Sequence, residues 1–195
     1  MASKHREYIK TSHIYGYDVH NNVYPIVSVD SHGHLATTTI IAKNIHDGVQ
    51  YGVGYYDSSL ASSGTIDLLI QTNGYDLWTL LSLAAGGDAL LQVYEGTTFS
   101  AAGTSLPPTN LNRTHSADSL EAVVTHTPTI TADGTLIWQQ FMPGGTGGNS
   151  AGGTLDTFQQ GIFAPNEDYL LRLTNLAGTA QPCQLTALLY EDTEH

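Results

Sequence analysis

The stretch FMPGGTGGNSAGGTLD, residues 141–156, contains a pattern typical of a hydrolase nucleophile. Gly148, Ser150 and Gly152 fit G-x-S-x-G, in which the serine sits on a sharp turn between a buried strand and a helix. Such a serine needs an Asp or Glu and then a His later in the chain. The residues after it indicate no helix, and the one downstream histidine is His195. Because six glycines in eleven residues also make this stretch costly to order, we predict no catalytic role for Ser150.

Histidine pairs are the next candidates for chemistry. His32 and His34 form an H-x-H pair of the kind that binds metal in cupins, where a nearby glutamate completes the site. No glutamate occurs between Glu7 and Glu95, and the pair falls in the predicted turn DSHGH, so we predict no metal there. The same reasoning applies to the isolated histidines His20, His46, His115 and His126.

Paired carboxylates would indicate glycoside hydrolysis, which needs two acids facing each other across a cleft. Glu167 and Asp168 are neighbours in sequence, and successive side chains of an extended chain point to opposite sides. The sequence leaves this chemistry unsupported without excluding it. We expect no catalytic residue, no cofactor and no bound metal.

Charge divides the chain into two parts. Residues 1–43 hold four basic and three acidic residues, a net charge of +1, whereas residues 44–195 hold two basic and fifteen acidic residues, a net charge of −13. Nucleic-acid binding requires clustered Lys and Arg, so no nucleic-acid partner is expected. Lys4, Arg6 and Lys10 lie close together, which leaves two interpretations open: a solvated terminus, or an arm that docks on an acidic partner or on a neighbouring subunit.

Hydropathy and cysteine content narrow the class of protein further. No window holds the roughly eighteen consecutive apolar residues that a membrane-spanning helix needs, and no apolar segment of an export signal follows the basic start. We therefore expect no membrane partner and synthesis in a reducing cytoplasm. The single cysteine, Cys183, lies in the apolar run CQLTALLY, which predicts a buried, unreactive thiol.

Extended segments follow one another along the chain. Runs rich in β-branched and apolar residues alternate with turn residues, as expected for strands. Residues 23–30 and 35–43 predict an N-terminal hairpin, and Asp133-Gly134 predicts another hairpin with a two-residue turn. Further strands are predicted at Thr65–Thr72, Ala89–Glu95, Ser119–Ile130, Thr135–Met142, Tyr169–Asn175 and Cys183–Glu191.

One segment, DLWTLLSLAAGG, fits both a helix and a strand. Its leucines have helical spacing, yet Gly86–Asp88 also predicts a turn that leads into the strand Ala89–Glu95 and makes a hairpin. We predict the strand, because the neighbouring elements are extended and periodicity alone does not settle a short apolar run. The whole pattern predicts an all-β, mainly antiparallel sandwich or barrel, with an arm and hairpin in residues 1–43 and a sandwich body in residues 44–195.

Several motifs resemble tailed-bacteriophage virion proteins of the capsid decoration, or cement, type. They are YEGTT, the stretch GT…P.N.NR, PT.T.DGT and the closing YLLRLTN.AG to YE, which run from about residue 64 to 191. The opening YGYDVHNNVYPIVSVDSHGHL is similar to a hairpin module near the start of phage structural proteins. The resemblance implies an antiparallel jelly-roll-like β-sandwich and a homotrimer. It also implies a non-enzymatic role on the capsid surface of the virion, with the major capsid protein as partner, after synthesis in the host cytoplasm.

The N-terminal arm and the long hydrophilic loop Tyr94–Ser116 are the predicted contact segments, because loops of this length are unusual in compact domains. Aromatic residues are enriched in interfaces, although ordinary strand packing explains the tyrosines equally well. The predicted interface residues are Lys4, Arg6, Tyr8, Lys10, Tyr15, Tyr17, Asn110, Asn112 and Arg113. The glycine-rich stretch, placed in a hairpin between Met142 and Leu155, is expected to order against a neighbour.

A second hypothesis is a tail, baseplate or fibre component that uses the same sandwich to bind carbohydrate on the host surface. Trp78 or Trp138 would then line the sugar site, because an indole ring packs on the apolar face of a sugar. A third hypothesis, a hydrolase acting on cell-surface polymers, has the least support, since the serine, histidine and carboxylate patterns each lack the partners that catalysis needs.

Overall fold

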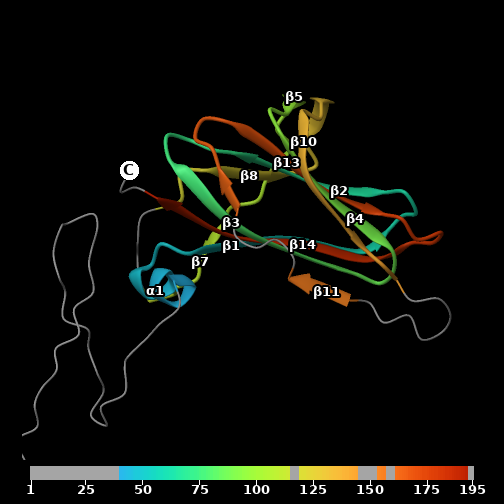
Figure 1. The fold of residues 1–195 in the computed structure, drawn as a ribbon, viewed down its shortest axis with the longest axis horizontal. Helices are drawn as coiled ribbons and strands as arrows, with labels where there is room; N and C mark the ends of the chain where they lie inside the picture. The colour runs from blue at the N-terminus through green and yellow to red at the C-terminus, as the bar shows by residue number, and fades with distance from the viewer. Residues whose placement is uncertain (1–39, 115–118, 145–152, 157–160, 193–195) are drawn as a thin grey trace, which may run out of the picture. The chain divides into compact units, whose positions relative to one another are not determined.

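The computed structural model describes residues 40–114, 119–144, 153–156 and 161–192. The chain divides into two units, Met1–Ile40 and Ile41–His195, and the second contains the elements of the fold (Figure 1). The predicted N-terminal hairpin lies outside the described residues, except for the last residues of its second strand.

Two six-stranded antiparallel sheets make up most of the described chain, one above the other in Figure 1. Sheet I has the order β11-β3-β14-β1-β7, with β12 also paired to β3; its strands are β1 (Tyr51–Leu60), β3 (Asp76–Ala85), β7 (Thr109–Asn110), β11 (Gly153–Asp156), β12 (Gly161–Phe163) and β14 (Gln181–Asp192). Sheet II has the order β10-β4-β13-β2-β8-β6; its strands are β2 (Thr65–Gln71), β4 (Ala89–Glu95), β6 (Thr104–Ser105), β8 (Val123–His126), β10 (Thr135–Met142) and β13 (Asp168–Asn175). A small sheet pairs β5 (Thr98–Ala101) with β9 (Thr129–Ala132). The all-β sandwich predicted from the sequence is confirmed.

Successive long strands alternate between the two sheets: β1, β3 and β14 belong to sheet I, and β2, β4 and β13 to sheet II. The hairpin predicted at the turn Gly86–Asp88 is therefore wrong. The turn Gly86–Asp88 joins β3 to β4 across the sandwich, and β13 to β14 and β10 to β11 cross in the same way. Turn residues show where the chain reverses, but they do not show which sheet the next strand joins.

The Asp133-Gly134 hairpin is also wrong, because β10 pairs with β4 and β9 pairs with β5. Gly134 has a φ of 92°, whereas Asp133 is not among the described residues with positive φ, and a type I′ turn needs positive φ at both positions. A Cβ atom on Gly134 would collide with the carbonyl oxygen of Glu95. The glycine therefore serves a close backbone approach to the end of β4.

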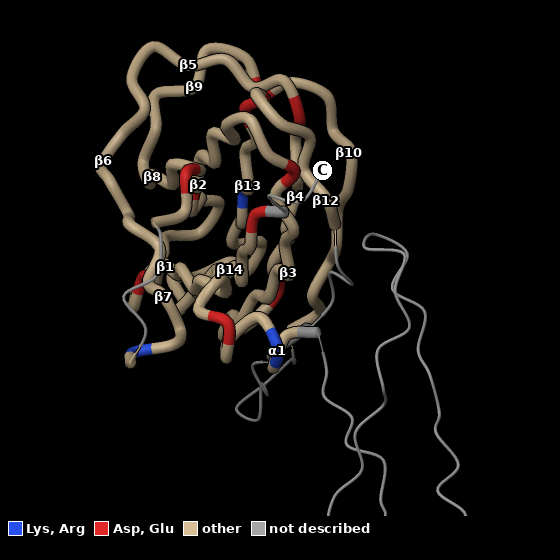
Figure 2. The backbone as a smooth tube through the Cα atoms, turned by 90° about the vertical axis from the view of Figure 1, so that its left-hand side faces the viewer, with Lys and Arg blue, Asp and Glu red and all other residues tan. Residues whose placement is uncertain are grey.

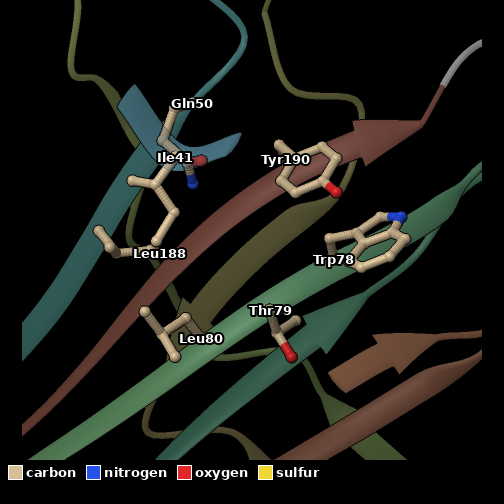
Figure 3. Close-up of a pocket in the computed structure, with 7 residues that line it drawn as sticks. All are labelled: Ile41, Gln50, Trp78, Thr79, Leu80, Leu188 and Tyr190. Carbon is tan, nitrogen blue, oxygen red and sulfur yellow. The ribbon is translucent and has the colours of Figure 1, made fainter. Parts of the chain in front are cut away.

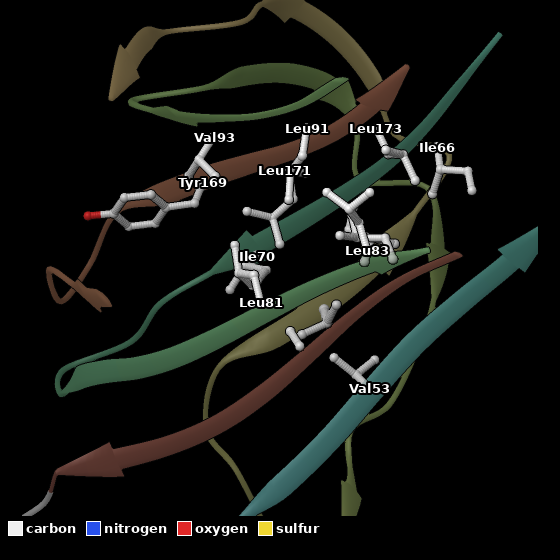
Figure 4. Close-up of a cluster of buried hydrophobic side chains, with 14 of the residues drawn as sticks. Val53, Ile66, Ile70, Leu81, Leu83, Leu91, Val93, Tyr169, Leu171 and Leu173 are labelled. Carbon is white, nitrogen blue, oxygen red and sulfur yellow. The ribbon is translucent and has the colours of Figure 1, made fainter. Parts of the chain in front are cut away.

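Alternating side chains from both sheets fill the space between them (Figure 4). On β3 every second residue is buried, including Leu77, Leu81 and Leu83, and the residues between them are half-buried. They meet Leu171 and Leu173 of sheet II in the same core cluster. This period of two confirms that the segment with helical spacing is a strand.

A helix, α1 (Ile40–Asp47), occupies the end of the segment 35–43, where a strand was predicted. Ile41 and Ile45 are half-buried and lie one turn apart, and Gly48 follows the helix with a φ of 75°, as expected for a residue that ends one. The β-branched isoleucines suggested a strand, but their spacing lets one helical face pack on the body.

The loop predicted at Tyr94–Ser116 is held by strand pairing in its described part. β5 pairs with β9, β6 with β8 and β7 with β1. Arg172 of β13 fixes the turn after β9: its guanidinium makes two 2.9 Å bonds to the carboxylate of Asp67 and one of 2.9 Å to Asp133. These bonds, led by those to Asp67, raise the pKa of Arg172 above its ordinary value.

Asn175, fully buried at the end of β13, joins three turns that cross between the sheets. Its side-chain nitrogen donates to the carbonyl oxygens of Leu60 (2.8 Å), Ala61 (3.0 Å) and Thr179 (3.0 Å), and its oxygen accepts from Ala177 N and Gln181 Nε2 (2.8 Å each). Gln181 Nε2 also donates to Asp88 O at 3.0 Å. One amide thus satisfies buried backbone groups that the crossing turns leave outside the strand ladders.

Candidate functional site: the outer face of sheet I

The side chains in the middle of sheet I that point away from the core form a surface without charged residues. Because Leu185, Ala187 and Leu189 of β14 are buried, the residues between them point outward, and the strand register places their partners on the same side. We call this surface the uncharged face; it consists of Gly52, Gly54, Tyr56, Trp78, Leu80, Ser82, Ala84, Gln184, Thr186, Leu188 and Tyr190. An acidic residue, Asp76, the first residue of β3, borders it.

The absence of charge on this face contrasts with the rest of the chain. The protein has 18 acidic and 6 basic residues, a net charge of −12. Figure 2 shows acidic positions in red on many parts of the body, and blue basic positions are sparse. Charged residues are depleted at the centres of protein interfaces, where aromatic residues are enriched, and the face has that composition.

An aromatic ridge crosses the uncharged face, formed by Trp78, Leu80, Leu188 and Tyr190 (Figure 3). Trp78 and Tyr190 are directly opposite each other on β3 and β14, with ring centroids 5.3 Å apart and planes 14° apart. Leu80 and Leu188 form the next pair along the same two strands. Cross-strand aromatic pairs of this kind stabilise the sheet and present a rigid apolar surface.

A small hollow of about 10 Å³ lies against the ridge, and Ile41, Gln50 and Thr79 complete its lining. Gln50 is buried, with 2% of its surface exposed. Its Nε2 donates to the carbonyl oxygen of Leu189 at 3.0 Å, while its Oε1 has no hydrogen-bond partner among the described residues. A buried amide oxygen without a donor is unfavourable, so a donor at this point would stabilise the site.

A trough runs along β1 next to the ridge, because Gly52 and Gly54 place no side chains on the outer face. It is an open depression of about 350 Å³, flanked by Tyr56, Leu111 and Leu188. A Cβ atom on Gly52 would lie 3.1 Å from the Leu111 side chain, and one on Gly54 would lie 3.2 Å from the hydroxyl of Thr186. We call this depression the glycine trough; its volume lies within the range of ligand and side-chain pockets.

Three of the predicted interface residues are described, and two of them bind within the chain. Asn110 Nδ2 donates to Gly48 O at 2.7 Å, and Asn112 Nδ2 donates to His46 O at 3.0 Å, so both side chains secure the end of α1. Arg113 follows them and is exposed. The other predicted interface residues lie outside the described residues: Lys4, Arg6, Tyr8, Lys10, Tyr15 and Tyr17.

The two tryptophans proposed for a sugar site have different environments. Trp78 lies on the aromatic ridge, whereas Trp138 of β10 is partly buried against the core. The register explains the second position, because Trp138 pairs with Val93, which points inward. Trp78 is therefore the tryptophan that the surface of sheet I presents.

The histidines and acids considered for chemistry do not converge in the described part of the chain. His126 stacks on Tyr55 with ring centroids 4.5 Å apart, and His46 is exposed on α1. Among the described residues, no group of three or more His, Cys, Asp and Glu side chains is placed to hold a metal ion. Ser150, His20, His32, His34 and His115 lie outside the described residues.

The groups with perturbed pKa values have structural surroundings. Burial raises the pKa of Tyr169 to about 12, with a further contribution from Glu95, whose Oε1 accepts from the phenol at 2.8 Å. The Tyr169 ring stacks on Phe163 with centroids 4.0 Å apart. Burial likewise raises the pKa of the Cys183 thiol, and the predicted buried cysteine is confirmed. These side chains point into the core, away from the uncharged face.

Comparison with protein-family models, with curated proteins and with solved structures finds no match for this chain. Within the described residues, no helix has the length and apolar character needed to cross a membrane. The uncharged face is therefore the basis on which a function is inferred.

The sequence patterns did not indicate the uncharged face, apart from Trp78. The strand β1 was not predicted, because the segment YGVGYYDSSL contains only Val53 as a branched aliphatic residue before Leu60 at its end. The available signal was in β3 and β14, where apolar residues occupy both sides of the strand: Trp78 and Leu80 point outward while Leu77 and Leu81 are buried. A strand with one side in water normally carries polar residues on that side.

Proposed function

We propose that this chain is a non-enzymatic structural protein of a phage virion, and more specifically a capsid decoration protein that binds the outside of the head and contacts the major capsid protein. The motifs that resemble decoration proteins support this role. The alternation of successive strands between two sheets also supports it, because it is the kind of connection found in jelly rolls, which are common in viral capsid domains.

The observation that carries the proposal is the uncharged face on a stiff antiparallel body. A decoration protein holds other subunits in place and performs no reaction, so it needs a rigid scaffold and a surface suited to protein contact. The face has aromatic and aliphatic residues at its centre and the acidic residue Asp76 at its border, and interfaces likewise have an apolar core and a polar rim.

Binding to purified empty heads tests the proposal. We expect the protein to co-sediment with heads in a saturable manner and to raise their melting temperature, because a ligand that binds the assembled state stabilises it. A protein that ignores heads and instead sediments with host cells contradicts the decoration role.

The basic N-terminal segment can be tested in the same assay. We expect a variant lacking residues 1–13 to keep the thermal unfolding of the sandwich body while binding heads more weakly, since this segment holds Lys4, Arg6 and Lys10. An unchanged affinity for heads would argue against an arm that takes part in assembly.

A second candidate is a tail, baseplate or fibre component that binds host carbohydrate. The Trp78–Tyr190 pair favours it, because aromatic rings pack on the apolar faces of sugars. A glycan array with the wild type and Trp78→Ala tests this candidate. Binding that Trp78→Ala abolishes, together with no affinity for heads, would replace the first proposal with the second.

A further inference from the structure

One margin of sheet II is a long strand with an open edge. The strand β10 stands at the end of the strand order and pairs with β4 alone among the described strands. The strands at the other margins, β6, β7 and β11, have two to four residues, whereas β10 has eight. Edge strands are commonly short, or carry charges or a proline that prevent further pairing, and Thr135–Met142 contains no charged residue and no proline. This edge is therefore open to pairing with another strand.

Backbone groups of two β10 residues point to the open edge. In an antiparallel ladder, alternate residues bond to the neighbour on one side, and the residues between them point to the other side. The carbonyl oxygen of Asp88 accepts from Leu176 N at 2.9 Å, on the β13 side, and this sets which residues of β4 bond to β10. By this alternation, Gln139 and Phe141 direct their N–H and C=O groups away from β4. Both residues are exposed, Phe141 to 52%.

Carboxylates lie at both ends of this edge. Asp133, which precedes β10, shares the guanidinium of Arg172 with Asp67, so these three side chains keep a net negative charge. At the other end, Asp88 accepts a hydrogen bond from Gly144 N, two residues after β10. Between these ends β10 is uncharged. A complementary strand is therefore uncharged at its centre, where apolar cross-strand pairs form, and basic at its ends.

A second copy of β10 lacks this complementarity. In an antiparallel pair the start of one strand lies beside the end of the other, so Asp133 of each copy would approach Asp88 of the other, and like charges oppose the pairing. We propose instead that β10 accepts an extended segment of another protein as an added strand of sheet II, and that this segment has an uncharged centre and Lys or Arg at its ends. In this mode of recognition, main-chain hydrogen bonds give affinity and side chains give specificity. The site lies on sheet II, so the inference does not depend on the function proposed for the uncharged face of sheet I.

A synthetic peptide of about ten residues is the probe, with a lysine at each end and alternating threonine and valine between them, so that it matches the length of β10 and its two ends. Fluorescence anisotropy of the labelled peptide with the full chain, without heads, measures binding. We expect saturable binding below about 1 mM peptide. Two control peptides should bind at least about tenfold more weakly: one whose central amides are N-methylated and cannot donate, and one with glutamate in place of both lysines.

Amide hydrogen exchange, followed by NMR, locates the bound peptide. We expect the amides of Gln139 and Phe141 to exchange rapidly in the free chain and slowly with peptide, whereas the amide of Gln140, which already bonds to β4, should change little. Gln139→Pro removes the N–H at the edge without removing a bond to β4, and it should weaken peptide binding at least about tenfold. Gln139→Ala is the matched control, because it keeps that N–H, and should change binding less than about twofold.

Absence of binding overturns the inference, as does equal binding of either control peptide. Slowed exchange on a strand other than β10 also overturns it, because the peptide then occupies a different edge. The exchange measurement on the wild type gives this answer even where Gln139→Pro does not fold. Because heads are absent, failure here leaves the head-binding result unaffected, and the two proposals fail separately.

Discussion

Replacing Asn175 by alanine tests the claim that one buried amide holds the crossing turns of the sandwich. The side chain is fully buried and makes five hydrogen bonds, of which those to Leu60 O and from Gln181 Nε2 are wholly buried. Losing either of these two bonds leaves a buried polar group without a partner and lowers the free energy of unfolding by about 1.5 kcal/mol. Losing each of the three part-buried bonds lowers it by about 0.5 kcal/mol. The expected loss in the free energy of unfolding is therefore about 4.5 kcal/mol.

Urea and thermal unfolding at fixed protein concentration measure this loss. For a chain of this size, about 4.5 kcal/mol corresponds to a fall of roughly 9–18 °C in Tm. Asn73→Ala is the matched control, because Asn73 is exposed and its amide makes one side-chain hydrogen bond, to the carbonyl oxygen of Glu121. We expect the control to lose less than about 1 kcal/mol. A loss of the same small size for Asn175→Ala would refute the role assigned to the buried amide.

Asn175→Asp separates hydrogen bonding from volume, because the two side chains have the same shape. A carboxylate at this position faces three carbonyl oxygens where the amide donated to them, so its folded pKa must rise above the usual value of about 3.9. The charged form is then the unfavourable one. Stability of this variant should fall as pH rises through and above about 4, and a variant with the same pH dependence as the wild type would contradict the assigned role.

Three further predictions concern the buried polar and sulfur groups. Burial and Glu95 raise the pKa of Tyr169 from 10.0 to about 12. The contribution of this shift to the free energy of unfolding is therefore complete below about pH 10 and is lost as the pH rises through about 12. Tyr169→Phe should reduce the alkaline loss of unfolding free energy by about 2 kcal/mol, as measured by urea unfolding at a series of pH values. Arg172→Met leaves the carboxylate of Asp67, which is 15% exposed, without its partner. The free energy of unfolding, measured by thermal unfolding, should fall by about 2 kcal/mol. No loss would show that the ion pair is dispensable. Cys183, 1% exposed with a raised pKa, should react with a maleimide reagent only as fast as the protein unfolds, and rapid labelling of the native protein would contradict its burial.

Local pattern was sufficient to predict strands wherever alternation and turn residues agreed. β4 and β10 have the bounds expected from the sequence, Ala89–Glu95 and Thr135–Met142, because each is an apolar run between turn residues. The predicted strand Ser119–Ile130 is in fact two strands, since Thr127 has a φ of 54° and Pro128 follows it. A proline and a positive φ end a ladder of strand hydrogen bonds. The β-branched residues on both sides of this point fit one continuous strand, so the sequence pattern did not indicate the break.

Pairing could not be predicted, because it depends on contacts between residues far apart in sequence. β1 pairs with β14 through Tyr51 and Leu189, nearly the whole length of the body apart, and a reversal at Gly86–Asp88 does not show whether the next strand joins the same sheet. The candidate site depends on this pairing. Trp78 and Tyr190 become neighbours only when β14 lies beside β3.

The apolar residues on the two sides of β3 have different surroundings. The inward leucines are covered by sheet II, which accounts for one set of alternating positions. Trp78 and Leu80 occupy the other set, where a strand facing water alone would gain from polar residues and where neither residue contributes to the core cluster. Exposed apolar patches that are contiguous and bordered by polar residues mark contact sites on soluble proteins. In a chain whose acidic residues outnumber its basic ones threefold, this patch can be covered by a partner without burying a carboxylate of the patch.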